Sequence, residues 1–187
     1  MVMPQMVERW TREMVLALPD DGMRHELIDG LHIVSPTPHF LHQRVVDVLG
    51  EQIRQYLKPL RVAAVMILPG DISLGEDEVL QPDLFVYPLT RPRPKHWLDI
   101  TSLLLVVEVL SPSTARYDRG LKRHRYQRAG TPEYWVVDID ARLVERWRPD
   151  DARPEVIDAF LEWRVAPDAD ALVIDLPAMW REALDED

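Results

Sequence analysis

The sequence lacks cysteine entirely in its 187 residues. This absence excludes disulfides, thiolate zinc sites, iron–sulfur clusters and a cysteine nucleophile, and it leaves the cytoplasm as the default location. The longest apolar run covers residues 62–68, far short of the about 18 residues that span a membrane. The first residues, 1–4, have neither a basic start nor an apolar stretch, which argues against a signal peptide. We therefore expect a cytoplasmic protein that does not bind membranes.

Glycine is also scarce, with 7 residues and no glycine-rich phosphate loop, so an enzyme with a nucleotide cofactor is disfavoured. The hydrophobic fraction of 47% and the charged fraction of 29% are those of an ordinary globular protein. The length predicts one domain over residues 1–187. We expect its core at about residues 20–148, followed by a C-terminal extension, 149–187, that can contact another copy of the chain.

The charge is acidic overall but uneven along the chain. A net charge of −10 argues against non-specific binding to nucleic acid. The segment 116–128 nevertheless carries six basic residues and one acid. This basic run is either a set of local phosphate contacts, with Arg119 and Arg123 as candidates, or only the solvated face of a helix.

The periodicity predicts an α/β protein. Apolar residues at helical spacing predict helices over 11–18, 39–58 (ended by Pro59), 115–129 and 177–184. Asp29-Gly30 between two short alternating runs indicates a β-hairpin near the N-terminus. Apolar or alternating runs predict strands over 62–68, 83–87, 103–110, 133–138, 143–147, 156–162 and 172–174. This order predicts a mixed β-sheet flanked by two long helices, one on each face.

Three acids occupy positions where apolar residues are expected. Glu108 interrupts an apolar strand, Asp83 begins another directly after Pro82, and Glu26 lies in the first strand of the hairpin. Each acid alone could simply be exposed at a strand end, because buried Asp and Glu need a partner or a metal. If the strands of Asp83 and Glu108 are neighbours, the two carboxylates can share one divalent cation, and their hard oxygens suit Mg²⁺, Mn²⁺ or Ca²⁺.

A second group of polar residues follows on the next helix. Asp118, Lys122 and Tyr126 are spaced at i, i+4 and i+8 and therefore share one helical face. Asp118 and Lys122 could be no more than a surface ion pair. If this face is turned toward Asp83 and Glu108, Lys122 lies near their metal.

These residues resemble the metal-dependent nucleases of the PD-(D/E)XK superfamily, and more closely the branch of "putative restriction endonucleases" known as domain of unknown function 820. The resemblance runs from Glu26 to Trp135. Its ordered segments are Glu26–Gly30, Ser35–Pro38 with His42, Gln81–Asp83, Val107–Thr114, and Asp118, Gly120, Lys122, Tyr126 with Gly130–Trp135. The dipeptide Pro82-Asp83 alone carries no information, but the ordered set is specific.

The resemblance implies a restriction-endonuclease-like three-layer sandwich and a Mg²⁺-dependent endonuclease that cleaves DNA. It implies metal ligands at Asp83, Glu108, the backbone carbonyl of Val109 and Glu26, with His42, Asp118 and Tyr126 as accessory residues. One departure is clear: the lysine expected two positions after the acid is Leu110 here. Lys122 is the candidate replacement, so the predicted catalytic set is Glu26, Asp83, Glu108 and Lys122.

Two functions remain open at this stage. The first is an active DNA endonuclease, favoured by the presence of Asp83, Glu108 and Lys122. The second is a catalytically inactive binding or assembly module of the same fold, favoured by Leu110 and the net negative charge. We also expect a homodimer or higher homo-oligomer, with Leu176, Met179 and Trp180 of the extension available for the contact.

Overall fold

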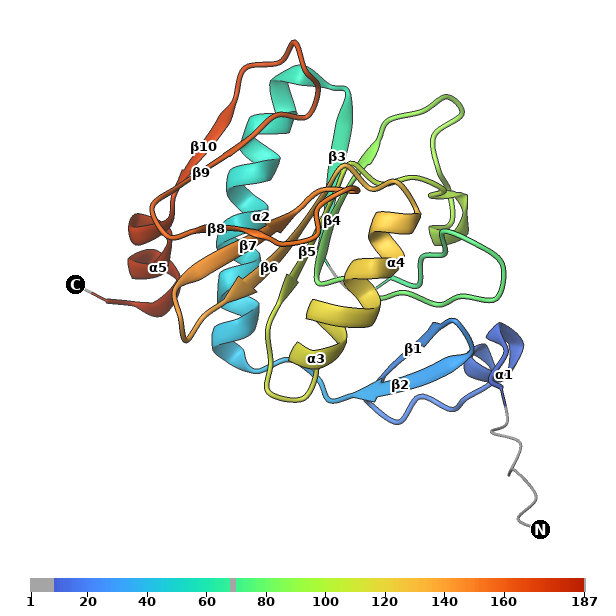
Figure 1. Cartoon of the computed structure of the whole chain (residues 1–187). Coiled ribbons are helices and arrows are strands. Elements are labelled where there is room, and N and C mark those ends of the chain that lie inside the picture. Colours follow the sequence, from blue (N-terminus) through green and yellow to red (C-terminus); the bar gives the residue numbers. More distant parts are fainter. Residues whose placement is uncertain (1–8, 68–69, 187) are drawn as a thin grey trace.

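The computed structural model describes residues 9–67 and 70–186 (Figure 1). The expectations about the N-terminal residues 1–4, and about Leu68 and Pro69, lie outside this part of the chain. Where sequence and structure can be compared, most predicted elements are present, and several differ in their limits.

The N-terminal region forms a short helix and a hairpin, as the sequence predicts. Helix α1 (Arg12–Leu16) begins at Thr11, whose hydroxyl accepts a hydrogen bond from the backbone N–H of Met14. Strands β1 (Arg24–Ile28) and β2 (Leu31–Ser35) pair antiparallel. Asp29 and Gly30 have φ angles of 53° and 80°, as a type I′ turn requires at both central positions.

Six strands form the central sheet, in the order β3-β4-β5-β6-β7-β8. Only β5 and β6 run parallel, so the sheet is mixed as expected. The bounds are β3 (Ala63–Ile67), β4 (Leu84–Pro88), β5 (Leu105–Val109), β6 (Glu133–Asp138), β7 (Leu143–Trp147) and β8 (Glu155–Ile157). The predicted segment 83–87 thus begins one residue late, which leaves Asp83 at the entrance to its strand.

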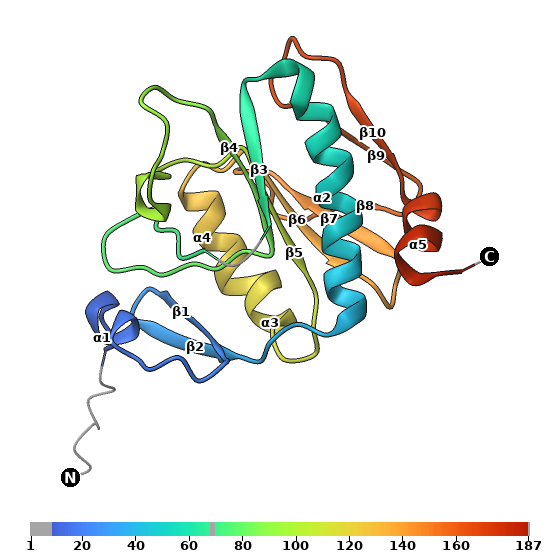
Figure 2. The same cartoon turned by 180° about the vertical axis from the view of Figure 1, so that it is seen from behind.

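Helices cover both faces of the sheet and make a three-layer arrangement (Figures 1 and 2). Helix α2 (Phe40–Leu60) packs Val45, Leu49 and Ile53 against one face. The prediction that Pro59 ends this helix was wrong. Pro59 lacks only its own N–H, and the N–H of Arg61 still bonds the carbonyl of Leu57, so the helix continues to Leu60.

The second long helix, predicted as regular over 115–129, is instead made of three consecutive segments. These are α3 (Ala115–Tyr117), the π-helical turn η2 (Asp118–Lys122) and α4 (Arg123–Arg128). A π-helical turn is wider than an α-helical turn and is common at functional sites. Two of the predicted functional residues, Asp118 and Lys122, are the first and last residues of this turn.

The C-terminal region packs on α2, beside the central sheet. Strands β9 (Phe160–Trp163) and β10 (Leu172–Asp175) form a separate ribbon, followed by α5 (Leu176–Leu184). The predicted strand 156–162 was wrong, because it divides between β8 and β9, which belong to different sheets. The docking role expected for Leu176, Met179 and Trp180 was also wrong, since all three are buried in the core with α2.

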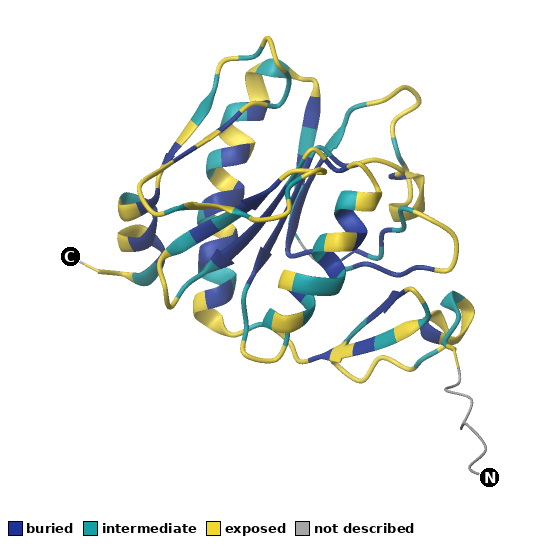
Figure 3. Cartoon of the chain, viewed as in Figure 1, coloured by how far each residue is buried: buried dark blue, intermediate teal, exposed yellow. Residues whose placement is uncertain are grey.

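Two hydrophobic cores lie on opposite faces of the sheet, and Figure 3 shows the central strands β5 and β6 between them as almost continuously buried. One core joins the sheet to α2, α5 and the β9–β10 ribbon, and the other joins it to α4 and the hairpin. Within residues 9–67 and 70–186, no helix is long and apolar enough to cross a membrane.

Candidate active site

Neighbouring strands bring Asp83 and Glu108 together. This neighbourhood was the condition under which the two carboxylates could share one cation. Leu84 on β4 pairs with Val107 on β5, so the antiparallel register places Asp83 opposite Glu108. Both side chains are 2% exposed. They line a narrow cavity of about 210 Å³ that also contains Arg24, His42 and Lys122, and that we call the carboxylate cleft. Residues 35–39 and 111–114 also line this cavity.

Asp83 has hydrogen-bond donors on both oxygens. Its Oδ1 lies 2.8 Å from NH1 of Arg24, and its Oδ2 accepts a hydrogen bond of 2.9 Å from the backbone N–H of Val109. Nε2 of His42 lies 3.1 Å from Oδ2 and 2.8 Å from the carbonyl oxygen of Val109. Asp83 is therefore fixed to the strand that carries Glu108.

Lys122 lies at the centre of a group of three buried acids. Its Nζ lies 2.7 Å from Oε2 of Glu26, 3.3 Å from Oε1 of Glu108 and 3.3 Å from Oδ1 of Asp118. All four side chains are at most 2% exposed. A buried ammonium needs such compensation, because an unpaired buried charge is strongly unfavourable. The structure thus places Lys122 beside Glu108, although Leu110 occupies the usual lysine position.

The hairpin contributes Glu26 through its inward face. Side chains alternate along a strand, so Arg24 and Glu26 lie on one face, where they contact Asp83 and Lys122 respectively, while His25 points to the opposite face. There His25 contacts His32, with 2.9 Å between their ring nitrogens. Oε1 of Glu26 accepts a hydrogen bond of 3.0 Å from the backbone N–H of Gln81, which ties the hairpin to the segment before Asp83.

Tyr126 lies behind the cluster and completes the face that the spacing predicted. Its ring stacks on Tyr134 with 5.2 Å between centroids, and Tyr134 donates its hydroxyl to the carbonyl oxygen of Asp118. The hydroxyl of Tyr126 is buried and has no hydrogen-bond partner among the described residues. Burial, reinforced by the negative charge of Glu108, raises the pKa of Tyr126 well above 10.0.

The two central acids differ in their electrostatics. Burial raises the pKa of Glu108 well above 4.5, and the nearby acids Asp83, Asp118 and Glu26 add to this effect against the attraction of Lys122. Burial also opposes ionisation of Asp83, but His42 and Arg24 outweigh it and hold its pKa at about 2. Asp83 is therefore the firmly ionised acid, and Glu108 is the one that lacks sufficient positive charge.

The donor set fits a hard divalent cation in charge and chemistry. Four buried carboxylates (Glu26, Asp83, Glu108, Asp118) face two permanently positive side chains, Arg24 and Lys122. When all four acids are ionised, the excess of two negative charges matches one Mg²⁺ or Mn²⁺, which prefer carboxylate and carbonyl oxygens. Within the described residues no three His, Asp or Glu side chains form a metal cluster by themselves. The ligands that fit are two carboxylates and a backbone carbonyl, those of Asp83, Glu108 and Val109.

The two arginines predicted to contact nucleic acid lie outside the carboxylate cleft. Arg119 makes ion pairs of 2.8 Å with Asp138 and 2.7 Å with Glu145. The guanidinium of Arg123 lies 4.3 Å from the ring centroid of Trp147. Arg119 lines a neighbouring cavity of about 460 Å³ that shares His42 with the carboxylate cleft. Their contact with a nucleic acid stays a prediction.

Sequence reasoning missed Arg24. A single arginine in a hairpin strand gives no signal by itself, and its partner Asp83 is 59 residues away in the chain. The alternation around Glu26 was the available clue, because residues two apart in a strand share a face. Negative charge on Asp83, Glu108 and Glu26 raises the pKa of Arg24 against the effect of burial.

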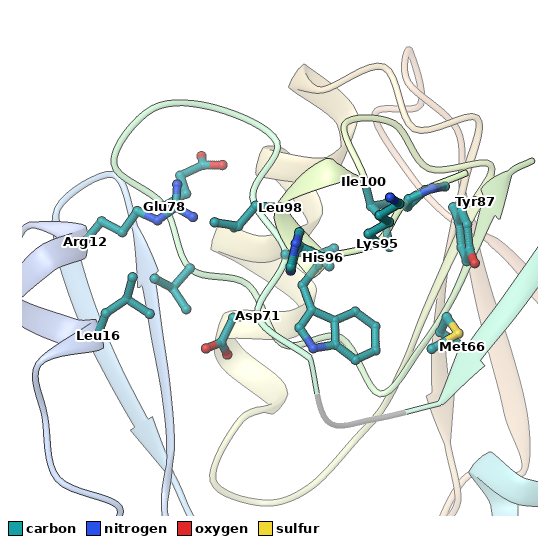
Figure 4. Close-up of a pocket in the computed structure, with 14 residues that line it drawn as sticks. Arg12, Leu16, Met66, Asp71, Glu78, Tyr87, Lys95, His96, Leu98 and Ile100 are labelled. Atoms are coloured by element: carbon teal, nitrogen blue, oxygen red, sulfur yellow. The ribbon is translucent and has the colours of Figure 1, made fainter. Parts of the chain in front are cut away.

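A larger cavity contains none of the predicted site residues. We call this cavity of about 590 Å³ the Trp97 cavity. Arg12 and Leu16 line it from the α1 side, and Met66 and Tyr87 from β3 and β4 (Figure 4). The short 3₁₀ helix η1 (Trp97–Asp99) contributes Trp97.

Comparisons with known proteins agree with the fold and with the resemblance. No curated protein matches the chain. A crystal structure described as "a putative nuclease belonging to DUF820 from Anabaena variabilis ATCC 29413" superposes with a TM-score of 0.78 at 23% identity, over 93% of this chain and 99% of that one. This likeness confirms the restriction-endonuclease-like fold. The family model "Uma2: Putative restriction endonuclease" matches residues 12–176. The chain therefore belongs to the Uma2 family of "putative restriction endonucleases".

Proposed function

We propose that this protein is a divalent-metal-dependent endonuclease that hydrolyses phosphodiester bonds in DNA, with Mg²⁺ or Mn²⁺ as cofactor. The observation that carries the proposal is the arrangement around Lys122 and Asp83. One ammonium lies among three buried carboxylates, and the acid beside them is fixed to the backbone of Val109. Membership in a family of restriction endonucleases supports a nuclease activity.

In this proposal Asp83, Glu108 and the carbonyl of Val109 hold the cation. When bound, the cation reduces the negative charge of the phosphate and lowers the pKa of the attacking water. Lys122 keeps Glu108 oriented through its 3.3 Å contact and offers its remaining N–H groups to the water or to a phosphate oxygen. Glu26 and Asp118 balance the charge of Lys122 and hold its Nζ in place.

Arg24 adds a fixed positive charge to the carboxylate cleft. It orients Asp83 through NH1 and also donates to the backbone carbonyl of Gln81. Its side chain is 15% exposed, in contrast to 2% for Lys122. A guanidinium at this position can bind a non-bridging phosphate oxygen of the substrate, because its planar N–H groups suit phosphate geometry.

The inactive binding module was favoured by Leu110 at the usual lysine position and by the net negative charge. Lys122 supplies an ammonium 3.3 Å from Glu108 from a different element, so the argument from Leu110 loses its force. A test of DNA cleavage distinguishes the active nuclease from the inactive module.

Cleavage of supercoiled plasmid in Mg²⁺ or Mn²⁺ tests the proposal, with linear duplex, single-stranded DNA and RNA as further substrates. We expect the wild type to nick DNA, and Glu108→Gln to lose at least about a thousandfold of the rate. The matched control Glu51→Gln changes an exposed acid on α2 and should cleave like the wild type. Absence of cleavage of any substrate would support the inactive module, and full activity in Glu108→Gln would contradict the role proposed for Glu108.

We also propose that the protein acts in the cytoplasm as a homodimer or higher homo-oligomer. The two strands of a duplex run in opposite directions, and each chain carries one carboxylate cleft, so two copies related by a twofold axis would present one site to each strand. Light scattering of the purified protein measures this directly. A monomer at all concentrations tested would exclude the oligomer.

A further inference from the structure

The Trp97 cavity shares no lining residue with the carboxylate cleft, and its lining is that of a binding site. Leu16, Trp97 and Leu98 in this lining are large, apolar and 37–52% exposed. Exposed apolar side chains gathered in one hollow mark a surface that binds a ligand or a partner. The volume of about 590 Å³ falls within the range of about 300–1,000 Å³ that ligand sites have. The chemistry of the lining then indicates which ligand fits.

The indole of Trp97 has one face covered by the backbone. A methyl group added at Gly70 would lie 2.7 Å from Cδ2 and Cε2 of the indole and 2.8 Å from Cε3. A point at nearly equal distances from these three atoms of the six-membered ring lies above its face, so Gly70 packs flat against one side of the indole. Trp97 is still 37% exposed and lines the cavity, which leaves the other face for a ligand. An open indole face binds planar aromatic groups by stacking.

The turn that carries Trp97 is fixed by hydrogen bonds within the chain. Oδ2 of Asp99 accepts from the backbone N–H groups of Lys95 and His96 at 2.7 Å and 2.9 Å. The backbone N–H of Ile100 donates to the carbonyl oxygen of Trp97 at 3.1 Å. A side chain held in place in this way loses little conformational entropy when a ligand binds.

The acids of the Trp97 cavity are paired within the protein. Asp71 accepts a hydrogen bond of 2.6 Å from the side chain of Gln81, and Glu78 forms an ion pair with Arg125. Their negative charge is therefore partly compensated by groups of the chain itself, and it opposes an anionic ligand less than two unpaired acids would.

Two cations of the cavity, by contrast, have no partner in the part of the chain that the structure describes. Within residues 9–67 and 70–186, Arg12 and Lys95 use only their backbone N–H groups in hydrogen bonds, and neither side chain makes an ion pair. Figure 4 shows the two side chains on different sides of the cavity, Arg12 on the side of α1 and Lys95 on the side where Tyr87 of β4 lies. Cations separated in this way suit an extended ligand with more than one negative group.

We propose that the Trp97 cavity binds a single strand of DNA, with one base stacked on Trp97 and the phosphates on either side of that base bound by Arg12 and Lys95. Proteins hold single strands by this combination of aromatic stacking and cations along the backbone. The bases of a duplex are already stacked on both faces, so a duplex offers no base to the indole without unstacking. The inference rests on the proposed function for DNA as the partner, and it adds a contact outside the carboxylate cleft that favours a single strand.

Fluorescence anisotropy with a labelled strand of about ten deoxyadenylates tests the stacking contact. The full-length protein is used without divalent metal, so that the strand is not cleaved. We expect Trp97→Leu to weaken binding by at least about fivefold and Trp97→Phe to stay within about twofold of the wild type, because only an aromatic ring stacks on a base. A duplex of the same length should bind the wild type and Trp97→Leu equally.

The salt dependence of the same binding tests the two cations. Arg12→Gln and Lys95→Gln should each weaken binding and reduce the slope of log affinity against log salt concentration by about 0.7, the contribution of one phosphate contact in a single strand. Lys58→Gln is the matched control, because Lys58 is an exposed lysine in the last turn of α2 and lines a different cavity. It should keep the slope of the wild type.

The indole N–H resonance of Trp97 locates the strand on the protein. The resonance is identified by its absence from the nitrogen-15 spectrum of Trp97→Phe. Addition of the single strand should shift it and leave the resonance of the fully buried Trp135 unchanged. Binding that does not shift the Trp97 resonance, or equal affinity in Trp97→Leu and the wild type, would overturn the inference.

The outcomes also separate the inference from the proposed function. A strand that shifts the Trp97 resonance in a protein that cleaves no DNA upholds the contact and contradicts the nuclease. Cleavage of DNA without a strand bound at Trp97 contradicts the contact alone. Absence of both binding and cleavage contradicts both.

Discussion

The carboxylate cleft and the Trp97 cavity lie in one small protein and differ in almost every respect. The carboxylate cleft has a volume of about 210 Å³, and its charged groups are paired and almost fully buried. The Trp97 cavity has about 590 Å³, and several of its large side chains, including Trp97 and Leu98, are exposed. The larger cavity thus has more room, whereas the smaller one holds the groups that can bind a cation and activate water.

Under the proposed function, the position of unfavourable charge indicates the chemistry better than cavity size does. Burying several like charges costs free energy, and a fold maintains such a cluster only with compensation. The Trp97 cavity contains two acids: Asp71 accepts a hydrogen bond of 2.6 Å from Gln81, and the buried Glu78 is paired with Arg125 alone. The two cavities therefore respond differently to the same kind of substitution.

The largest expected difference between the two cavities is in the rate of DNA cleavage, when one acid in each cavity is changed to its amide. Asp83→Asn should lower the rate of DNA cleavage by at least about a thousandfold, because the amide removes a charged ligand of the cation. Asp71→Asn keeps an oxygen that can accept from Gln81, so its rate should stay within about twofold of the wild type. Plasmid nicking in Mn²⁺ measures both. Equal rates in the two variants would remove the distinction between the cavities.

Stability should differ strongly when a single side chain is truncated in each cavity. Lys122→Met leaves three buried carboxylates without their ammonium, so the free energy of unfolding should fall by about 3–5 kcal/mol. Leu98→Ala removes a half-exposed side chain of the Trp97 cavity and should change it by less than about 0.5 kcal/mol. Urea denaturation of the metal-free proteins measures both values.

If Lys122→Met does not fold at neutral pH, its recovery at lower pH gives the same information. Burial raises the pKa values of Glu108 and Asp118, so both lose their charge earlier than exposed acids as the pH falls. The variant should therefore be closer to the wild type in stability at pH 5 than at pH 8. If the difference in stability between Lys122→Met and the wild type does not change with pH, the buried carboxylate charges are not its cause.

The pH dependence of stability should distinguish Glu108 from Asp83 in the metal-free protein. The pKa of Glu108 is raised by folding, so its contribution is favourable at low pH and is lost as the pH rises from 4.5 through the folded value. The pKa of Asp83 is lowered to about 2, so its contribution is present above 3.8 and is lost as the pH falls through about 2. Glu108→Gln should flatten the loss of stability above pH 4.5. An unchanged slope would show that Glu108 does not cause it.

Local patterns in the sequence identified the elements that follow from local interactions. Asp29-Gly30 correctly predicted the hairpin, since its turn requires two positive φ angles that these residues adopt easily. The spacing of Asp118, Lys122 and Tyr126 correctly predicted that they share one face, and the structure shows that this face is buried. The π-helical turn within that face was missed, because residue spacing alone does not reveal one extra residue per turn.

The contacts that the sequence did not predict join distant parts of the chain. Arg24 reaches Asp83 across 59 residues, and His42 reaches Val109 across 67. Neither pairing has a local periodicity, so only the assembled fold brings the partners together. The C-terminal extension was misjudged for the same reason: the apolar face of α5 was visible, but its partner α2 within the same chain was not.

Calorimetric titration of Mn²⁺ into the wild type and Glu108→Gln tests the central claim most directly, because it asks whether the buried excess of negative charge is a cation site. The account predicts one Mn²⁺ per chain in the wild type and affinity lower by at least about tenfold in Glu108→Gln. No heat of binding in the wild type, or identical binding in both proteins, would contradict it.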